Sequence, residues 1–78
     1  MKRVYPPAEY RRVAHLLWDH IEAGLYKSGE KLPTVVQLAE LHGIKEGAAY
    51  AALRLLTNEG VVIARRGQGY YVKERKET

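Results

Sequence analysis

The segment from residue 32 to residue 53 constrains the fold more than any other part of the chain. Thr34 is followed three residues later by Gln37, and a Thr-x-x-Gln spacing is a capping box that marks the start of a helix. His42 and Gly43 end this helix, where a left-handed residue is needed, and helical periodicity resumes at Glu46. Two helices joined by so short a turn predict a helix-turn-helix, whose second helix commonly enters the DNA major groove.

Apolar spacing predicts which face of each helix is buried. In the first helix of the motif, the predicted apolar stripe consists of Leu38, Ala39 and Leu41. In the second helix, the predicted core face consists of Ala49, Ala52, Leu53 and Leu56. The opposite face of the second helix carries Glu46, Gly47, Tyr50 and Arg54. This second set is therefore the one expected to meet DNA.

The segments on either side of the motif complete the predicted fold. Helical spacing predicts a further helix from residue 8 up to Gly24, and residues 58–60 end the helix of the motif. Two short strands, 61–64 and 70–72, flank a basic glycine-rich turn. The order predicts an α+β, mainly α fold, a winged helix-turn-helix with three helices and a C-terminal β-hairpin wing. We expect a single domain over 1–78, with a basic arm 1–6, a folded core 7–73 and a charged tail 74–78.

Smaller expectations concern single residues. Lys31-Leu32 is expected to form a short strand ahead of the motif. Leu16 and Trp18 fall outside the stripe of the first helix, so one of them should be partly exposed, and Trp18 either forms a contact surface or packs on a neighbouring loop. Tyr70 and Tyr71 point to opposite faces of a strand, so one is expected in the core and the other exposed.

Length and composition limit the classes of function. A chain of 78 residues is enough for one small core, and zero cysteines exclude disulfides, thiolate zinc sites and a cysteine nucleophile. No apolar run approaches the roughly 20 residues that span a bilayer, so we expect a cytoplasmic protein with no membrane partner. The net charge of +4 favours a polyanionic partner, although the placement of that charge matters more than its size.

A set of scaffold residues, in order and without gaps, runs through nearly the whole chain. The set consists of Tyr10, Val13, Ala14, Leu17, Ile21, Gly24, Tyr26, Gly29, Leu32, Pro33, Thr34, Leu38, Ala39, Gly43, Ile44, Ala52, Leu53, Leu56, Glu59, Gly60, Gly67, Gly69 and Val72. This pattern resembles the DNA-binding domain of GntR-type bacterial transcription regulators. The resemblance implies a winged helix-turn-helix that binds operator DNA, usually as a dimer on a near-palindrome.

The chain departs from the family's pattern where the family contacts DNA. The family commonly has Arg at the position of Val36, Ser/Thr-Arg at Lys45 and Glu46, and Arg at Tyr50. The basic residues and glycines of the wing follow the pattern more closely. Family members also carry a C-terminal ligand-binding and dimerisation domain that this sequence does not contain. We therefore expect either a stand-alone binder, as small phage or plasmid regulators are, or an excised domain.

Two groups of residues are predicted to contact duplex DNA. On the motif's second helix, Glu46 can accept a hydrogen bond from cytosine, and Gly47 lets the backbone come close to the bases. The alternative is a solvated face on which Glu46 only favours the positive helix N-terminus. The arginines of the hairpin reach phosphates or the minor groove, or else protect a strand edge. The predicted DNA-binding residues are Thr34, Lys45, Glu46, Gly47, Tyr50, Arg54, Arg65, Arg66, Gly67 and Gln68.

The sequence carries no arrangement typical of catalysis. His15, His20 and His42 lack the spacing and acidic partners of a metal site, so we predict no metal, no cofactor and no enzyme. The leading prediction is sequence-specific double-stranded DNA binding in transcription regulation, by a homodimer or by tandem copies. Two alternatives stay open. One is an excisionase-like or architectural DNA-binding accessory protein, and the other is a winged-helix protein–protein interaction module that docks through the alanine-rich helix or the Trp18 surface.

Overall fold

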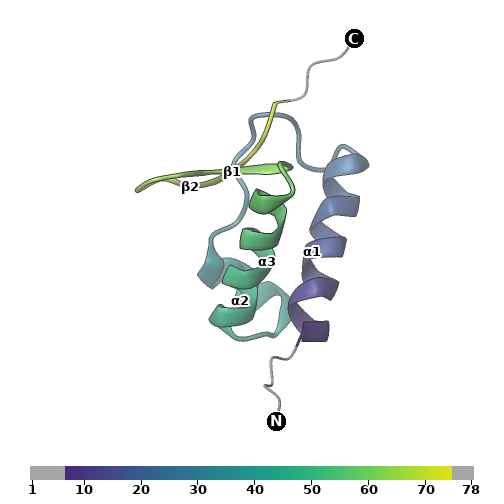
Figure 1. Cartoon of the computed structure of the whole chain (residues 1–78), viewed down its shortest axis with the longest axis vertical. Helices are drawn as coiled ribbons and strands as arrows, with labels where there is room; N and C mark the ends of the chain where they lie inside the picture. Colours follow the sequence, from purple (N-terminus) through teal and green to yellow (C-terminus); the bar gives the residue numbers. More distant parts are fainter. Residues whose placement is uncertain (1–6, 75–78) are drawn as a thin grey trace.

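Three helices pack side by side, and a hairpin extends from one side of them (Figure 1). The computed structural model describes residues 7–74, so the predicted arm 1–6 and residues 75–78 of the tail lie outside the described part. The elements are α1 (Pro7–Glu22), α2 (Val35–His42), α3 (Glu46–Asn58), β1 (Val62–Arg65) and β2 (Gly69–Val72). The two strands pair antiparallel. This arrangement confirms the predicted α+β, mainly helical winged helix-turn-helix.

The boundaries of α2 follow from the capping residues that the sequence presents. Thr34 Oγ1 accepts a hydrogen bond from the backbone N–H of Gln37 at 3.1 Å, and Gln37 Oε1 accepts one from the backbone N–H of Thr34 at 3.0 Å. The predicted capping box is therefore confirmed. Gly43 ends the helix with φ 63°, in the left-handed region where glycine carries no side-chain penalty. α3 begins only three residues later, so the turn between the two helices is short.

One continuous hydrophobic core lies between the helices and the base of the hairpin. All four residues predicted for the buried face of α3 have an exposed fraction of 0%. The stripe of α1 packs against them, and α2 covers the same helix from another side. Leu32, Val62 and Val72 continue the core into the sheet. Among the described residues no polar or charged side chain is buried, so burial of apolar surface is the main stabilising term.

The prediction for Leu41 is wrong, because this side chain is 67% exposed. Leu38 and Ala39 are the buried residues of α2. At 3.6 residues per turn, Leu41 is rotated about 110° around the helix axis from the direction midway between Leu38 and Ala39. The eight-residue helix covers the core with a narrow stripe only, so Leu41 faces away from it. Val36, also on α2, is 50% exposed.

The hairpin is part of a slightly larger sheet. Lys31 forms an isolated antiparallel bridge with Tyr71, and the backbone N–H of Leu32 donates to the carbonyl of Tyr70 at 2.8 Å. The short strand expected at Lys31-Leu32 is thus present as a single bridge. The strand boundaries differ from the predicted ones by one residue, because Arg65 and Gly69 form the last pair before the loop. The loop of the wing is therefore only residues 66–68.

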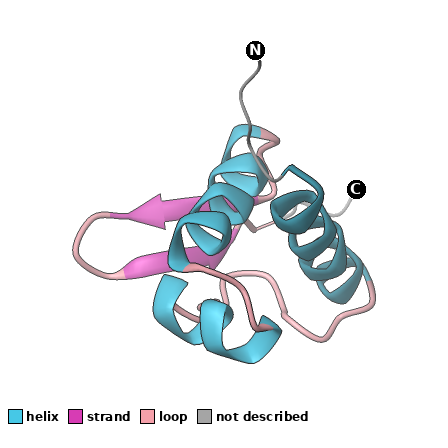
Figure 2. Ribbon diagram, turned by 90° about the horizontal axis from the view of Figure 1, so that it is seen from below, coloured by secondary structure: helices cyan, strands magenta, loops and turns pink. Residues whose placement is uncertain are grey.

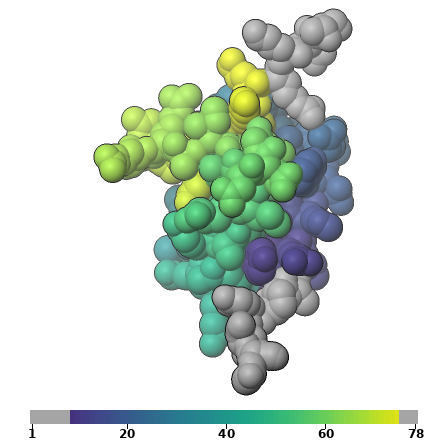
Figure 3. Space-filling view, viewed as in Figure 1, coloured from purple at the N-terminus to yellow at the C-terminus, as the bar shows by residue number. Residues whose placement is uncertain are grey.

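The expectation for the two tyrosines of β2 is wrong, since both are half-buried. Tyr70 is half-buried and packs against the core from the hairpin, which projects beyond the helices (Figure 3). Tyr71 lies on the outer face, where the guanidinium of Arg65 sits 5.0 Å from its ring centroid. Trp18 is half-buried and packs against the core, and Leu16 is also half-buried.

Candidate DNA interface

The exposed face of α3 carries the predicted contact residues. Lys45 is the N-cap, with extended backbone and no side-chain capping bond, and Glu46 is the acidic residue of the first turn. Both side chains and Gly47 are exposed. No ion pair joins Lys45 to Glu46 within the described residues. Glu46 therefore stands free at the positive end of the helix, able to accept a hydrogen bond from a partner.

Gly47 leaves an open space on the surface of α3. A Cβ built at this position has no neighbouring heavy atom within 4 Å. Its φ is not positive, so an L side chain fits the local backbone without strain. Neither packing nor backbone conformation in the free protein requires glycine here. The open surface is what a close approach of DNA to the helix backbone needs.

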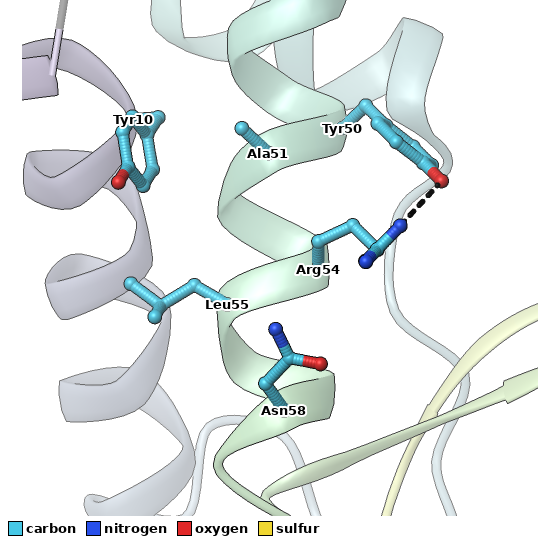
Figure 4. A pocket seen from close by; sticks show the side chains of 6 residues that line it. All are labelled: Tyr10, Tyr50, Ala51, Arg54, Leu55 and Asn58. Carbon is cyan, nitrogen blue, oxygen red and sulfur yellow. Dashed lines mark hydrogen bonds between the residues drawn. The ribbon is translucent and has the colours of Figure 1, made fainter.

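Tyr50 and Arg54 are joined on the same face, one turn apart. The Nη1 atom of Arg54 donates a hydrogen bond to the hydroxyl oxygen of Tyr50 at 3.3 Å, and the guanidinium carbon lies 6.0 Å from the centroid of the ring. This hydrogen bond, and to a smaller extent the charge interaction with Tyr70 of the wing, raise the pKa of Arg54 above its ordinary value. Figure 4 shows both side chains leaving α3 on the side away from Tyr10 and Leu55.

The wing places its polar residues at the end of a projecting hairpin. Arg65 ends β1, and Arg66, Gly67 and Gln68 form the loop, all of them exposed. The backbone N–H of Gln68 donates to the carbonyl of Arg65 at 2.9 Å and closes the turn. Figure 2 shows the loop reaching away from the helices, on the side of α3 opposite α1. The two arginines thus stand in different settings, because Arg65 lies over Tyr71 while Arg66 is at the tip.

Thr34 and the wing line the same hollow, a proximity that the sequence did not indicate. An open hollow of 450 Å³ is lined by Thr34 at the start of α2 and by the wing residues from Ala64 to Tyr70. The start of α2 and the loop of the hairpin therefore border one continuous surface. Thr34 thus combines an exposed position with its capping hydrogen bond to Gln37.

Lys31 is a cation beside the wing that was not among the predicted contact residues. Its side chain reaches Gly69 of β2, where its Cε would lie 3.1 Å from a Cβ built at that residue. Gly69 has a φ of 120°, so glycine is favoured there both by backbone conformation and by the stem of Lys31. The signal in the sequence was a lysine in a strand-forming pair ahead of the motif, but the sequence did not show that this pair joins β2.

The site as a whole is a cationic surface with exposed hydrogen-bonding groups. Lys31, Lys45, Arg54, Arg65 and Arg66 are all exposed, and Glu46 is the acidic residue at the start of α3. Within residues 7–74 no group of three His, Cys, Asp or Glu side chains could hold a metal ion. None of the described helices is both long and apolar enough to cross a membrane. Such a surface is suited to recognition of a polyanion.

Comparison with known proteins identifies sequences of the same pattern. The family model described as bacterial regulatory proteins, gntR family, matches residues 9–72. The chain is 37% identical over 67 residues to an uncharacterized HTH-type transcriptional regulator, YjiR, of Escherichia coli, and the match covers 86% of this chain and 14% of the relative. It is 33% identical over 69 residues to the Uxu operon regulator of Haemophilus influenzae, covering 88% of this chain and 26% of that protein. The chain thus spans a minor part of the length of these relatives.

The fold has a counterpart among solved structures. A GntR family transcriptional regulator from Listeria monocytogenes superimposes with a TM-score of 0.83 at 25% sequence identity. The match covers 96% of this chain and 64% of that one. The region matched by sequence and the region matched by structure are therefore nearly the same, and both include α3 and the wing.

Proposed function

Because this chain belongs to the gntR family of bacterial regulatory proteins, we propose that it binds double-stranded operator DNA sequence-specifically and serves in the regulation of transcription. In this proposal α3 enters the major groove and the wing lies along the neighbouring backbone or minor groove. The family match over residues 9–72 includes both elements. The domain acts by binding, and the proposal assigns no chemical step to it.

The observation that carries this proposal is that α3 and the wing share one face. Arg54 is exposed on α3, and the hairpin packs beside the same helix through β1. Thr34 borders the same surface through the hollow that it shares with the wing. A duplex lying on this face can therefore meet α2, α3 and the wing at the same time.

The start of α3 supports a role in reading bases. The major groove is about 12 Å wide and admits one α-helix, whose N-terminal residues contact the base edges. Glu46 can accept a hydrogen bond from the N4 amino group of cytosine, and Gly47 lets the bases approach the helix backbone. The half-buried Ala48 and Ala51 add little bulk on either side of this path. We propose that base preference comes from this turn of the helix.

The wing and the N-terminus of α2 supply the contacts that do not depend on sequence. Arg65, Arg66 and Gln68 are exposed at or next to the tip, where they can reach phosphate oxygens or the minor groove. Thr34 lies beside them and carries a hydroxyl group that can also donate to phosphate. These groups fix the position of α3 on the duplex.

We further propose that two copies bind one operator. A single DNA-binding module of this kind buries about 600 to 1,000 Å² on DNA, which is small for a tight and specific complex. Two copies related by a two-fold axis would read half-sites about one helical turn apart. The proposed apolar contact between copies is either Trp18, half-buried on α1, or Ile63, 38% exposed on β1. Sedimentation at saturating protein tests this, and strictly one-to-one binding would exclude it.

Selection of bound duplexes from a random DNA pool tests the proposed function directly. Enrichment of one motif is the expected result, and a palindromic motif would support two copies in two-fold symmetry. A protein-interaction module would enrich nothing and show no salt-sensitive affinity for DNA. An architectural or excisionase-like factor would bind and bend DNA, often in tandem copies. A bending assay on the enriched duplex therefore separates that alternative from a regulator that binds a palindrome.

A further inference from the structure

The pair formed by Tyr50 and Arg54 has more hydrogen-bonding capacity than the protein itself uses. Arg54 carries five N–H donors, and one of them is directed at the oxygen of Tyr50. Tyr50 accepts that bond with a lone pair, so its own O–H remains free to donate. Tyr50 is 46% exposed and Arg54 is also exposed. Two adjacent donor groups, one of them charged, therefore face solvent from the same side of α3 (Figure 4).

The two side chains of the pair are already in contact in the free protein. The hydrogen bond of 3.3 Å links side chains one helical turn apart, and the guanidinium stays near the tyrosine ring at 6.0 Å from its centroid. A long arginine side chain normally loses considerable rotamer freedom when it binds a ligand. Here Tyr50 has already restricted that freedom, so less is lost on contact. Tyr50 is thus a positioning residue for Arg54 as well as a donor itself.

The place of Arg54 on α3 decides which part of DNA it meets. Arg54 is eight residues from the start of the helix, or about 12 Å along the axis at 1.5 Å per residue. Base edges are contacted by the N-terminal residues of a recognition helix, so Arg54 lies beyond that part. The hairpin packs beside α3 through β1. A strand of the duplex that leaves the groove of α3 and passes towards the wing crosses this position.

We propose that Tyr50 and Arg54 together clamp one backbone phosphate of the bound duplex, between the groove occupied by α3 and the wing. This inference rests on the proposed DNA-binding function. A phosphate offers two acceptor oxygens and a negative charge, which match the Tyr50 hydroxyl and the guanidinium. The N7 and O6 atoms of guanine offer a similar pair of acceptors, so a base contact is the outcome that the experiment must separate from a phosphate contact.

The experiment measures affinity of the full chain for two kinds of duplex over a range of salt concentrations. One duplex carries the motif enriched from the random pool, and the other is a mixture of random sequences. The variants are Tyr50→Phe, Arg54→Gln and the double variant. Tyr26→Phe and Lys27→Gln are the matched controls, because they remove a phenol hydroxyl group and a positive charge from the segment between α1 and the motif. Circular dichroism confirms that each variant is folded.

Arg54→Gln should make the plot of log affinity against log salt shallower by about 0.9, because one phosphate contact is lost. Tyr50→Phe should weaken binding about tenfold on both duplexes without changing that slope, since it removes a hydrogen bond and no charge. In the Arg54→Gln background, Tyr50→Phe should cost less than about threefold, because the two residues act as a unit. Both controls should bind like the parent.

Several results would overturn the clamp. Equal affinity of Tyr50→Phe and parent would show that the hydroxyl does not contact DNA. A loss of affinity for the enriched duplex, with no loss on random duplexes, would assign the pair to guanine instead of phosphate. If the parent binds no duplex at all, the proposed function itself fails. That result is distinct from a parent that binds while the variants match it, in which case only the clamp fails.

Discussion

Replacement of Gly47 by alanine should stabilise the free protein and weaken its binding to DNA. The free structure has open space where the new Cβ would lie, with no heavy atom within 4 Å, and the φ of Gly47 is not positive. Alanine at a compatible position stabilises by about 0.4 to 1 kcal/mol through the unfolded state. For a domain of this size, this corresponds to a rise of about 2 to 8 °C in the unfolding midpoint.

The effect on DNA binding should have the opposite sign. If bases approach the backbone of α3 at Gly47, an added methyl group overpacks the interface. Overpacking of a well-packed contact costs about 1 to 3 kcal/mol, which is about 5- to 150-fold in affinity. Gly47→Leu should weaken binding further, because the larger side chain still meets no protein atom at its Cβ but occupies more of the groove.

The assay pairs thermal unfolding with competition binding to the selected duplex. His15→Ala is the matched control, because it also increases helix propensity, at an exposed position of α1 away from the proposed interface. The control should bind DNA like the parent. If Gly47→Ala gains stability and keeps full affinity, α3 does not approach DNA at this turn, and the reasoning from the open space at Gly47 is refuted.

Three further predictions concern other parts of the same surface. Arg65→Ala combined with Arg66→Ala should make the plot of log affinity against log salt shallower by about 2 and weaken binding to all duplexes alike, and an unchanged slope would remove the wing from the interface. Glu46→Gln should raise non-specific affinity for DNA and relax the preference at one base pair by about 1 to 3 kcal/mol. If the affinities for single-base variants of the duplex stay unaltered, Glu46 only interacts with the positive N-terminus of α3. Thr34→Ala should lower the free energy of unfolding by about 0.5 to 2 kcal/mol in urea titration, because it removes one half of the capping box, and Thr34→Ser should restore most of that loss.

Local signals in the sequence were enough to predict the elements and most of the core. The capping box at Thr34 and the left-handed Gly43 depend on neighbouring residues only, so the sequence alone predicts them. The buried face of α3 follows from a strong helical period. Leu41 was misplaced because a short helix covers only a narrow arc of core, and the width of that arc depends on the packing of α2 against α3.

The arrangement of the candidate site depended on long-range contacts. The sequence did not indicate that Thr34 lies beside the wing, and only the folded chain brings them to one hollow. Lys31 lies beside the wing because it forms a β-bridge with Tyr71, which is forty residues later in the sequence. The link between Tyr50 and Arg54 is local and could have been anticipated from their i, i+4 spacing. The position of this pair relative to the wing could not be anticipated, since it depends on how the hairpin packs beside α3.

The central claim, that α3 reads the major groove, is tested most directly by changing single groups of the selected duplex one groove at a time. Replacing cytosine by N4-methylcytosine removes the N4 hydrogen that faces the major groove, and replacing thymine by uracil removes a methyl group from the same groove. Replacing guanine by inosine removes only the minor-groove amino group. Affinity should fall by about 1 to 3 kcal/mol at one or more of the major-groove changes under α3, and stay unchanged for inosine at those positions. Loss of affinity with the inosine changes alone would contradict the account. Unchanged affinity with every modification in both grooves would contradict it as well.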